Sequence, residues 1–152
     1  MSDKLITIMI GLPASGKSTI ANSLDQIVLS RDNFVLELSG HNNYNLAFNS
    51  VDQVEVDTCF NNQLSELCNS GKSFIIDKTH MTAKSRNKST QIARSKCYKI
   101  KFIVVMTSYQ TILERNKNRD NKFIPEYVIE NMMKSFEMPF DNEYDEIEYV
   151  GI

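Results

Sequence analysis

The sequence predicts an α/β fold, a doubly wound parallel sheet of about five strands with helices on both faces, formed by a single domain over residues 1–152. Apolar runs of strand length alternate with helical stretches along the chain, which is the order of a parallel sheet with crossover helices. A glycine-rich turn joins the first apolar run to the first helical stretch. Hydrophobic residues make up 41% of the 152 residues and charged residues 24%, a composition typical of a globular domain with a buried core.

Five apolar runs are expected to form the strands. Four are bounded by polar or turn-forming residues, and the last alternates apolar and polar residues as an edge strand does. The runs are residues 5–10, 26–29, 73–77, 101–106 and 147–150. The last run lies in an acidic C-terminal tail, residues 141–152. From the sequence this tail either packs as the fifth strand or extends free.

Helices are expected between these strands. They are residues 18–24, 33–38, 51–69, 82–95, 109–116 and 125–136. In the longest of them the apolar residues recur at helical spacing, at Val51, Val54, Phe60, Leu64 and Leu67. Gly71 ends that helix, and Pro125 suits the first turn of the last one. Turn-forming residues predict a flexible loop at about residues 39–50.

The turn after the first strand is the phosphate-binding motif G-x-x-x-x-G-K-[ST], here Gly11-Leu12-Pro13-Ala14-Ser15-Gly16-Lys17-Ser18. In a strand-loop-helix context, backbone N–H groups and a helix N-terminus surround an anion. Lys17 supplies a charge for the β- and γ-phosphates, and the Ser18 hydroxyl can ligate Mg²⁺. The motif predicts a site for ATP or another nucleoside triphosphate with Mg²⁺. The expected nucleotide-binding residues are Gly11, Ala14, Ser15, Gly16, Lys17, Ser18 and Thr19.

Polar residues follow the second and third strands, and the carboxyl ends of parallel strands share one rim of the sheet. Asp32 could take a proton from a hydroxyl that attacks the γ-phosphate, or it could cap the next helix. Asp77 could help to hold Mg²⁺ or its waters. Thr79 and His80 offer donors to a substrate, although an ordinary turn before a helix capped at Thr82 explains them equally well.

Arg115 and Arg119 lie four residues apart and share a face if the helix continues. Arginines on a mobile lid, here about residues 115–124, can neutralise charge that develops on a transferred phosphoryl group. Surface arginines are common, so spacing alone does not decide between this role and a solvated one.

Charge and cysteine content restrict the function classes. Residues 84–122 contain eleven Lys or Arg and two acids, which suits either a solvated helix face or a surface that attracts a polyanion. The three cysteines are widely spaced, which favours free thiols in a reducing compartment. The sequence contains no apolar stretch of membrane-spanning length and no signal-peptide pattern, so a cytoplasmic protein without a membrane partner is expected.

The chain resembles the 5′-kinase domain of phage polynucleotide kinase and its bacterial end-healing relatives, and with them the P-loop kinase fold. The resemblance runs from about Leu5 to Phe136 and rests on motifs that occur in the family's order. Those motifs are residues 11–19, the triplet Ser30-Arg31-Asp32, the stretch Ile75-Ile76-Asp77-Lys78-Thr79-His80, the R-x-x-x-R pair Arg115 and Arg119, and Ile124-Pro125 running on to Met132-Met133-Lys134-Ser135-Phe136.

The resemblance implies a role for each matching residue. Lys17 would contact the β/γ-phosphates of ATP, and Ser18 the metal. Asp32 would be the general base for the 5′-hydroxyl of RNA or DNA. Arg119 would act from the lid at the transition state, supported by Arg115, and Thr79 would lie near the acceptor's phosphate. A fused phosphatase or ligase domain is not expected, so a separate 3′-phosphatase and ligase would be partners in end healing.

Two positions depart from the family pattern. Val35 stands where the family places an arginine that grips the acceptor's 3′-phosphate, and His80 stands where it often has asparagine. The grip could be rebuilt from Arg31, Lys78 or Arg86. A kinase for a small-molecule hydroxyl is therefore an alternative, and a nucleotide-dependent binding or switch protein is a second one.

Overall fold

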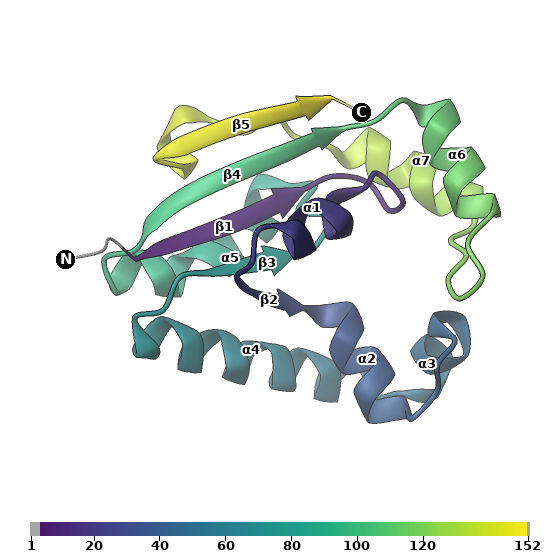
Figure 1. Cartoon of the computed structure of the whole chain (residues 1–152), viewed down its shortest axis with the longest axis horizontal. Helices are drawn as coiled ribbons and strands as arrows, with labels where there is room; N and C mark the ends of the chain where they lie inside the picture. The colour runs from purple at the N-terminus through teal and green to yellow at the C-terminus, as the bar shows by residue number, and fades with distance from the viewer. Residues whose placement is uncertain (1–3, 152) are drawn as a thin grey trace.

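A parallel five-stranded sheet forms the centre of the protein in this computed structural model, which describes residues 4–151 (Figure 1). The strands are β1 (Leu5–Ile10), β2 (Ile27–Ser30), β3 (Phe74–Asp77), β4 (Lys99–Met106) and β5 (Glu146–Gly151). Their order across the sheet is β2-β3-β1-β4-β5, and all neighbours pair in parallel. Because β1 lies between β3 and β4, the direction of connection reverses beside β1, where open parallel sheets bind ligands. The predicted α/β fold class is confirmed.

Helices cover both faces of the sheet because neighbouring residues of a strand point to opposite sides. Met9 of β1 packs in one cluster with Ala21 of α1 (Lys17–Ser23). Ile8 packs on the other face, in the main cluster with Leu64 of α4 (Gln53–Ser70) and Ala93 of α5 (Ala83–Ser95). The strands between these layers are buried on both sides, as their nearly continuous apolar sequences require.

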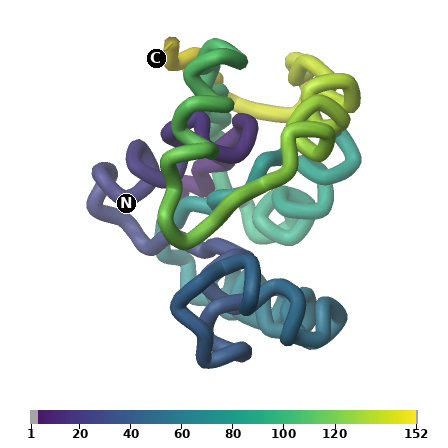
Figure 2. Tube along the Cα trace, turned by 90° about the vertical axis from the view of Figure 1, so that its right-hand side faces the viewer, coloured from purple at the N-terminus to yellow at the C-terminus, as the bar shows by residue number. Residues whose placement is uncertain are grey.

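A small helical lobe follows β2. It consists of α2 (Arg31–Ser39), α3 (Tyr44–Ser50) and the first turns of α4. Val35, Ala47 and Val56 form its buried cluster, one residue from each helix. The lobe lies below the segment that connects α6 (Tyr109–Lys117) to α7 (Glu126–Ser135), as Figure 2 shows.

The expected loop at residues 39–50 is corrected, because residues 44–50 are helical. Asn43 caps α3, since its side-chain oxygen accepts hydrogen bonds from the backbone N–H groups of Asn45 (3.0 Å) and Leu46 (3.2 Å). Burial of Ala47 then holds α3 against α2 and α4. The turn formers act only before it, where Gly40 ends α2 with φ +73°.

The acidic tail packs against the sheet through residue 151. After the short 3₁₀ helix η1 (Asp141–Glu143), β5 pairs with β4 along its whole length. Arg86 of α5 is fully buried and donates from Nε to Glu143 Oε1 over 2.8 Å. This ion pair fixes the beginning of the tail to α5. No helix within residues 4–151 combines the length and the apolarity that a bilayer crossing requires.

Candidate active site

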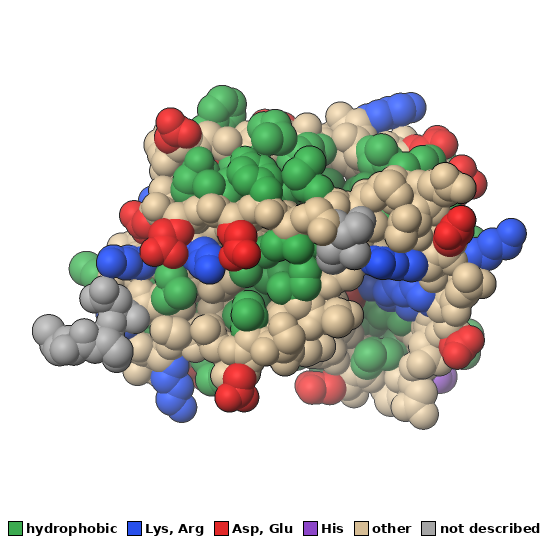
Figure 3. All heavy atoms as spheres, turned by 45° about the horizontal axis from the view of Figure 1, so that its top comes forward, with side chains coloured by type: hydrophobic (Ala, Val, Ile, Leu, Met, Phe, Trp, Pro, Cys, Tyr) green, Lys and Arg blue, Asp and Glu red, His purple; other side chains and the backbone are tan. Residues whose placement is uncertain are grey.

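A cleft of about 1010 Å³ opens where the strands end. Its walls come from the phosphate loop (residues 11–18), the carboxyl ends of β2 and β3, the helical lobe and the lid (residues 115–124). In Figure 3 a group of Lys and Arg side chains lies beside a hollow on the right-hand side of the molecule. The cleft is large enough for a nucleotide together with a second substrate.

The phosphate loop needs glycine at its first position. A Cβ on Gly11 would lie 2.8 Å from Ser15 Oγ and 3.2 Å from the carbonyl oxygen of Val105. The Gly11 N–H donates to the carbonyl of Thr79 over 3.1 Å, which joins the loop to the segment after β3. Gly16 adopts φ 99° directly before α1 begins at Lys17. The loop therefore curls tightly in front of a helix N-terminus, the geometry that binds phosphate.

Contacts from behind hold the loop in place. The carbonyl oxygen of Ser15 accepts hydrogen bonds from Thr107 Oγ1 (2.6 Å) and from Arg115 Nη1 (3.3 Å). The Ser15 hydroxyl is buried, and its oxygen has no hydrogen-bond partner among residues 4–151. Arg115, a predicted catalytic residue, thus contacts the loop backbone, which fits a supporting role.

Lys17, Ser18 and Asp77 lie together at the base of the cleft. Ser18 Oγ donates to Asp77 Oδ2 over 2.6 Å, so the two predicted metal residues face one another. A hydroxyl and a carboxylate are oxygen ligands of the kind that Mg²⁺ prefers, and the pair fits such an ion. Burial lowers the pKa of Lys17 against the opposing pull of Asp77. A bound anion would compensate this half-buried ammonium group.

Asp32 lies in the first turn of α2 and does not cap it. The helix begins at Arg31, so the carboxylate projects into the cleft. It accepts a hydrogen bond from Lys122 Nζ of the lid over 2.5 Å. Burial would raise its pKa, but the charge of Lys122 and a hydrogen bond from Tyr44 outweigh burial and hold the pKa below its ordinary value. Asp32 is therefore ionised at neutral pH, as a general base must be.

Arg119 lines the same cleft, although it does not share a helix face with Arg115, because α6 ends at Lys117. Its Nη1 atom is buried and makes no hydrogen bond within the described part of the chain. Burial lowers the pKa of Arg119, with Asp32 and Tyr44 acting in the opposite direction. A buried guanidinium nitrogen without a partner at a cleft wall is suited to a phosphate oxygen.

The proposed acceptor-binding residues differ in how free their side chains are. Arg31 donates to Asp57 Oδ1 (2.8 Å) and Gln53 Oε1 (2.7 Å), so its guanidinium group is bound to α4. Lys78 is half-buried, with Nζ 4.3 Å from the ring centre of Phe60, and it forms no ion pair with any described residue. Thr79 also lines the cleft.

The expectation that His80 and Arg86 contact a substrate is corrected. His80 borders the cleft, but its ring is 2% exposed and both nitrogens are bonded, Nδ1 to the carbonyl of Met9 and Nε2 to Ser89 Oγ, each over 2.7 Å. Burial lowers the pKa of His80 to about 3, so the ring is neutral. Arg86 is also committed, because besides Glu143 it donates to the carbonyl of His80 over 2.9 Å. Both residues hold the segment after β3 in place.

Lys122 and Tyr44 are site residues that sequence reasoning missed. Lys122 lies in the same polar segment as Arg119, and this proximity in sequence is the feature that could have identified it as a site residue. Tyr44 lay in the expected loop, and no local pattern brings it to Asp32.

The fold matches several solved structures. A putative kinase from Chloroflexus aurantiacus aligns with a TM-score of 0.71 and 15% identity over 99% of this chain and 89% of that one. A chain of the Pnkp1/Rnl/Hen1 RNA repair complex aligns with a TM-score of 0.73 and 21% identity over 89% of this chain and 44% of that one. A sugar kinase from a Janibacter species aligns with a TM-score of 0.64 and 16% identity over 99% of this chain and 86% of that one. These identities support a shared fold.

Sequence comparison with family models identifies the family. No curated protein matches the chain in sequence. The model of the AAA domain family AAA_33 matches residues 6–139, a range that includes the phosphate loop, Asp32, Asp77 and the lid. The chain therefore belongs to this AAA domain family and has the α/β fold of P-loop kinases.

Proposed function

We propose that this protein is a kinase that transfers the γ-phosphate of ATP to the 5′-hydroxyl of RNA or DNA. The charge of the cleft is the observation that carries the proposal. Among the described residues, six Lys or Arg and two Asp line it, which leaves an excess of four positive charges. A nucleoside triphosphate with its Mg²⁺ would cancel only part of this excess; a phosphate-bearing acceptor would balance the rest, whereas a neutral sugar would not.

The donor half would hold ATP through the phosphate loop and Lys17. Ser18 and Asp77 would hold Mg²⁺, which when bound neutralises charge on the β- and γ-phosphates. The buried Arg119 nitrogen without a partner supports this assignment, because Arg119 lines the cleft and can donate to a phosphate oxygen.

In the transfer step Asp32 would accept the proton of the acceptor hydroxyl. The acceptor oxygen then forms a bond to the γ-phosphorus, the bond from this phosphorus to the β-phosphate oxygen breaks, and ADP leaves with that electron pair. Lys17 and Arg119 would stabilise the charge that develops on the transferred group. The proton on Asp32 passes to solvent, which completes the balance.

The acceptor's phosphate would be bound by Lys78. The family's arginine position is Val35, which is fully buried in the lobe and cannot reach a ligand. Of the three cations that could replace it, Arg86 is buried and Arg31 is paired with Asp57. Lys78 lines the cleft without an ion pair to any described residue, and this supports its assignment.

A kinase for a small-molecule hydroxyl is the second candidate. The burial of Val35 favours it, because a small neutral acceptor needs no phosphate grip. The fold similarity to a sugar kinase is consistent with it. In this case Asp32 keeps its role and Lys78 has none in acceptor binding. Separate 3′-phosphatase and ligase partners belong only to the first candidate.

Labelled ATP tests both candidates in parallel reactions with 5′-hydroxyl oligonucleotides and with free sugars and sugar acids. We expect label on the oligonucleotide and a loss of about 10²- to 10⁴-fold in Asp32→Ala, the usual contribution of a general base. Nucleotide affinity, measured by calorimetry, should change little in this variant.

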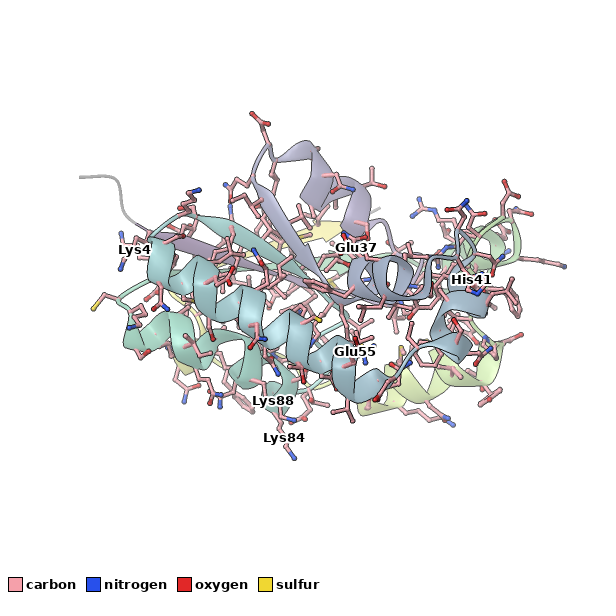
Figure 4. The ribbon with its side chains drawn as sticks, turned by 90° about the horizontal axis from the view of Figure 1, so that it is seen from below. Lys4, Glu37, His41, Glu55, Lys84 and Lys88 are labelled. Atoms are coloured by element: carbon pink, nitrogen blue, oxygen red, sulfur yellow. The ribbon has the colours of Figure 1, made fainter. Side chains whose placement is uncertain are left out.

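Glu37→Ala is the matched control, since Glu37 is an exposed acid on the same helix and does not line the cleft (Figure 4). Label on a sugar but not on any oligonucleotide would replace the first candidate by the second. Full activity of Asp32→Ala would remove the base from either mechanism.

A further inference from the structure

The lid is fastened to α3 by backbone and side-chain hydrogen bonds. The Tyr44 N–H donates to the carbonyl of Asn121 over 2.7 Å. Asn45 bonds both polar groups of Phe123, accepting from its N–H at 2.8 Å and donating to its carbonyl at 2.7 Å. Figure 2 shows this green segment reaching down to the blue helices of the lobe. The lid therefore bridges the donor side of the cleft and the lobe that carries Asp32.

Lys122 lies at the centre of this bridge. Its ammonium group is 2.5 Å from Asp32 Oδ2 and 4.2 Å from the ring centre of Tyr44. The Lys122 side chain is 20% exposed. It also acts on the charge of Lys17, so it lies within electrostatic range of the phosphate loop. Because the Tyr44 ring and the hydrogen-bonded backbone of the lid restrain the lysine, this ion pair loses less side-chain entropy than a surface pair, while solvent still screens the Asp32 side chain, which is 45% exposed.

The charged and titratable groups that face Asp32 come from every element around it. Lys17 belongs to α1, Tyr44 to α3, and Arg119 and Lys122 to the lid. Lys122 is the one cation among the described residues that forms an ion pair with Asp32. Lys17 and Arg119 act on it from a greater distance and are assigned to phosphate oxygens.

We propose that Lys122 is a positioning residue that orients the Asp32 carboxylate, so that docking of the lid on α3 and preparation of the base are one event. The inference rests on the proposed function in one respect, that Asp32 is the base. A carboxylate bound to a fixed cation keeps one orientation and meets an incoming hydroxyl without reorganisation. When the lid leaves α3, Lys122 leaves with it, and Asp32 faces the solvent-filled cleft without its partner.

The first test needs no activity. Hydrogen exchange of the Phe123 and Tyr44 amides, which donate across the contact between the lid and α3, reports lid docking in the wild type, in Lys122→Gln, in Asp32→Asn and in the double variant. We expect each single variant to raise lid exchange several-fold and the double variant to add little, because both remove one contact. Lys84→Gln, an exposed lysine that points away from the molecule in Figure 4, should leave exchange unchanged. Unchanged lid exchange in Lys122→Gln, or additive effects, would overturn the proposal.

The second test uses the pH dependence of phosphoryl transfer. Loss of the ammonium group raises the pKa of Asp32, so the acid limb of kcat should move to higher pH in Lys122→Gln, with kcat about 10-fold lower at neutral pH. Lys122→Arg should restore part of the lost kcat and should move the acid limb part of the way back toward its wild-type pH. A lysine that only holds the lid would raise KM and leave the acid limb in place, which would contradict the proposal. If the wild type phosphorylates no acceptor, the proposed function fails, and the exchange experiment still decides whether the contact between Lys122 and Asp32 holds the lid on α3.

Discussion

The two sides of the cleft are held by different means. On the donor side, the phosphate loop and Asp77 follow β1 and β3, which pair in register and are buried in the main core. On the acceptor side, Asp32 is held by a lobe whose buried cluster has three residues and by lid contacts that two side chains provide, Asn45 and Lys122. Under the proposed function, the side that would bind ATP is fixed by the sheet, and the side that would bind the acceptor is held by a small number of side-chain contacts.

Val35 illustrates the difference. In the family that the sequence resembles, this helical position supplies a cation to the acceptor, whereas here it supplies a methyl-bearing side chain to the core of the lobe. One substitution can thus exchange ligand binding for packing, because the lobe is so small that a residue of α2 serves either purpose.

Among the variants that separate the two sides, Gly11→Ala is expected to give the largest effect and to impair the donor side alone. The added methyl group meets Ser15 Oγ at 2.8 Å and the Val105 carbonyl at 3.2 Å, and such overpacking costs about 1–3 kcal/mol. We expect ATP to bind roughly 10- to 100-fold more weakly. Calorimetric titration with a nonhydrolysable ATP analogue measures the loss.

Two variants make this prediction sharper. Gly151→Ala places its methyl group where no described atom lies within 4 Å and should bind ATP as the wild type does. Adding Ser15→Ala to Gly11→Ala removes the nearest clashing atom and should recover part of the affinity. If Gly11→Ala weakens ATP binding equally in the wild type and in Ser15→Ala, the Val105 carbonyl dominates the clash.

His80 tests the rigidity of the donor side through pH. Its pKa of about 3 lies below the ordinary value of 6.5, so the stability that the neutral ring contributes is complete above pH 6.5 and is lost as pH falls toward 3. Between pH 7 and pH 5 this group alone should lower the free energy of unfolding by about 2 kcal/mol. Urea unfolding at both pH values measures the difference.

His80→Gln should reduce this pH dependence, because glutamine does not titrate. His41→Gln is the matched control, since His41 is exposed (Figure 4). Equal pH dependence in the wild type and His80→Gln would show that protonation of His80 does not govern acid stability.

Asn45→Ala should give the smallest effect and act on the acceptor side alone. It removes two hydrogen bonds to Phe123 at an exposed position, worth about 1 kcal/mol in total. Steady-state kinetics should show a kcat/KM for the acceptor about 5-fold lower and an unchanged KM for ATP. Asn62→Ala, on the exposed side of α4, is the control, and a rise in the KM for ATP as large as the loss in acceptor kcat/KM would contradict the division into two sides.

The sequence was sufficient for the features that local chain geometry determines. Apolar runs located all five strands, although β4 begins at Lys99 rather than at residue 101. The glycine pattern located the phosphate loop. Helical periodicity located α4 but not its contacts, since Val54 is 71% exposed while Val56 is buried. Periodicity misleads there because the first turns of α4 pack on the lobe and the later turns on the sheet.

The contacts around Asp32 could not be predicted in this way. Lys122 is 90 residues from Asp32 along the chain, and only the assembled lobe and lid bring them together. His80 follows a strand end, where spacing predicted a side chain at the rim. His80 instead has a left-handed φ of 50°, and its ring is buried. This conformation is uncommon for a residue other than glycine, so the sequence does not predict it.

The position of β5 bears on self-association. It is an outer strand of the sheet, and such a strand presents unpaired backbone groups to which another molecule's strand can add. Glu146 and Glu148 are exposed along it, and the lysine of the Lys101–Glu148 pair, at 3.4 Å, belongs to β4. Two copies approaching edge to edge would therefore bring acid against acid. Among the described residues no strand pairs with the outer edge of β5, and we expect the acidity of the tail to disfavour aggregation through that edge.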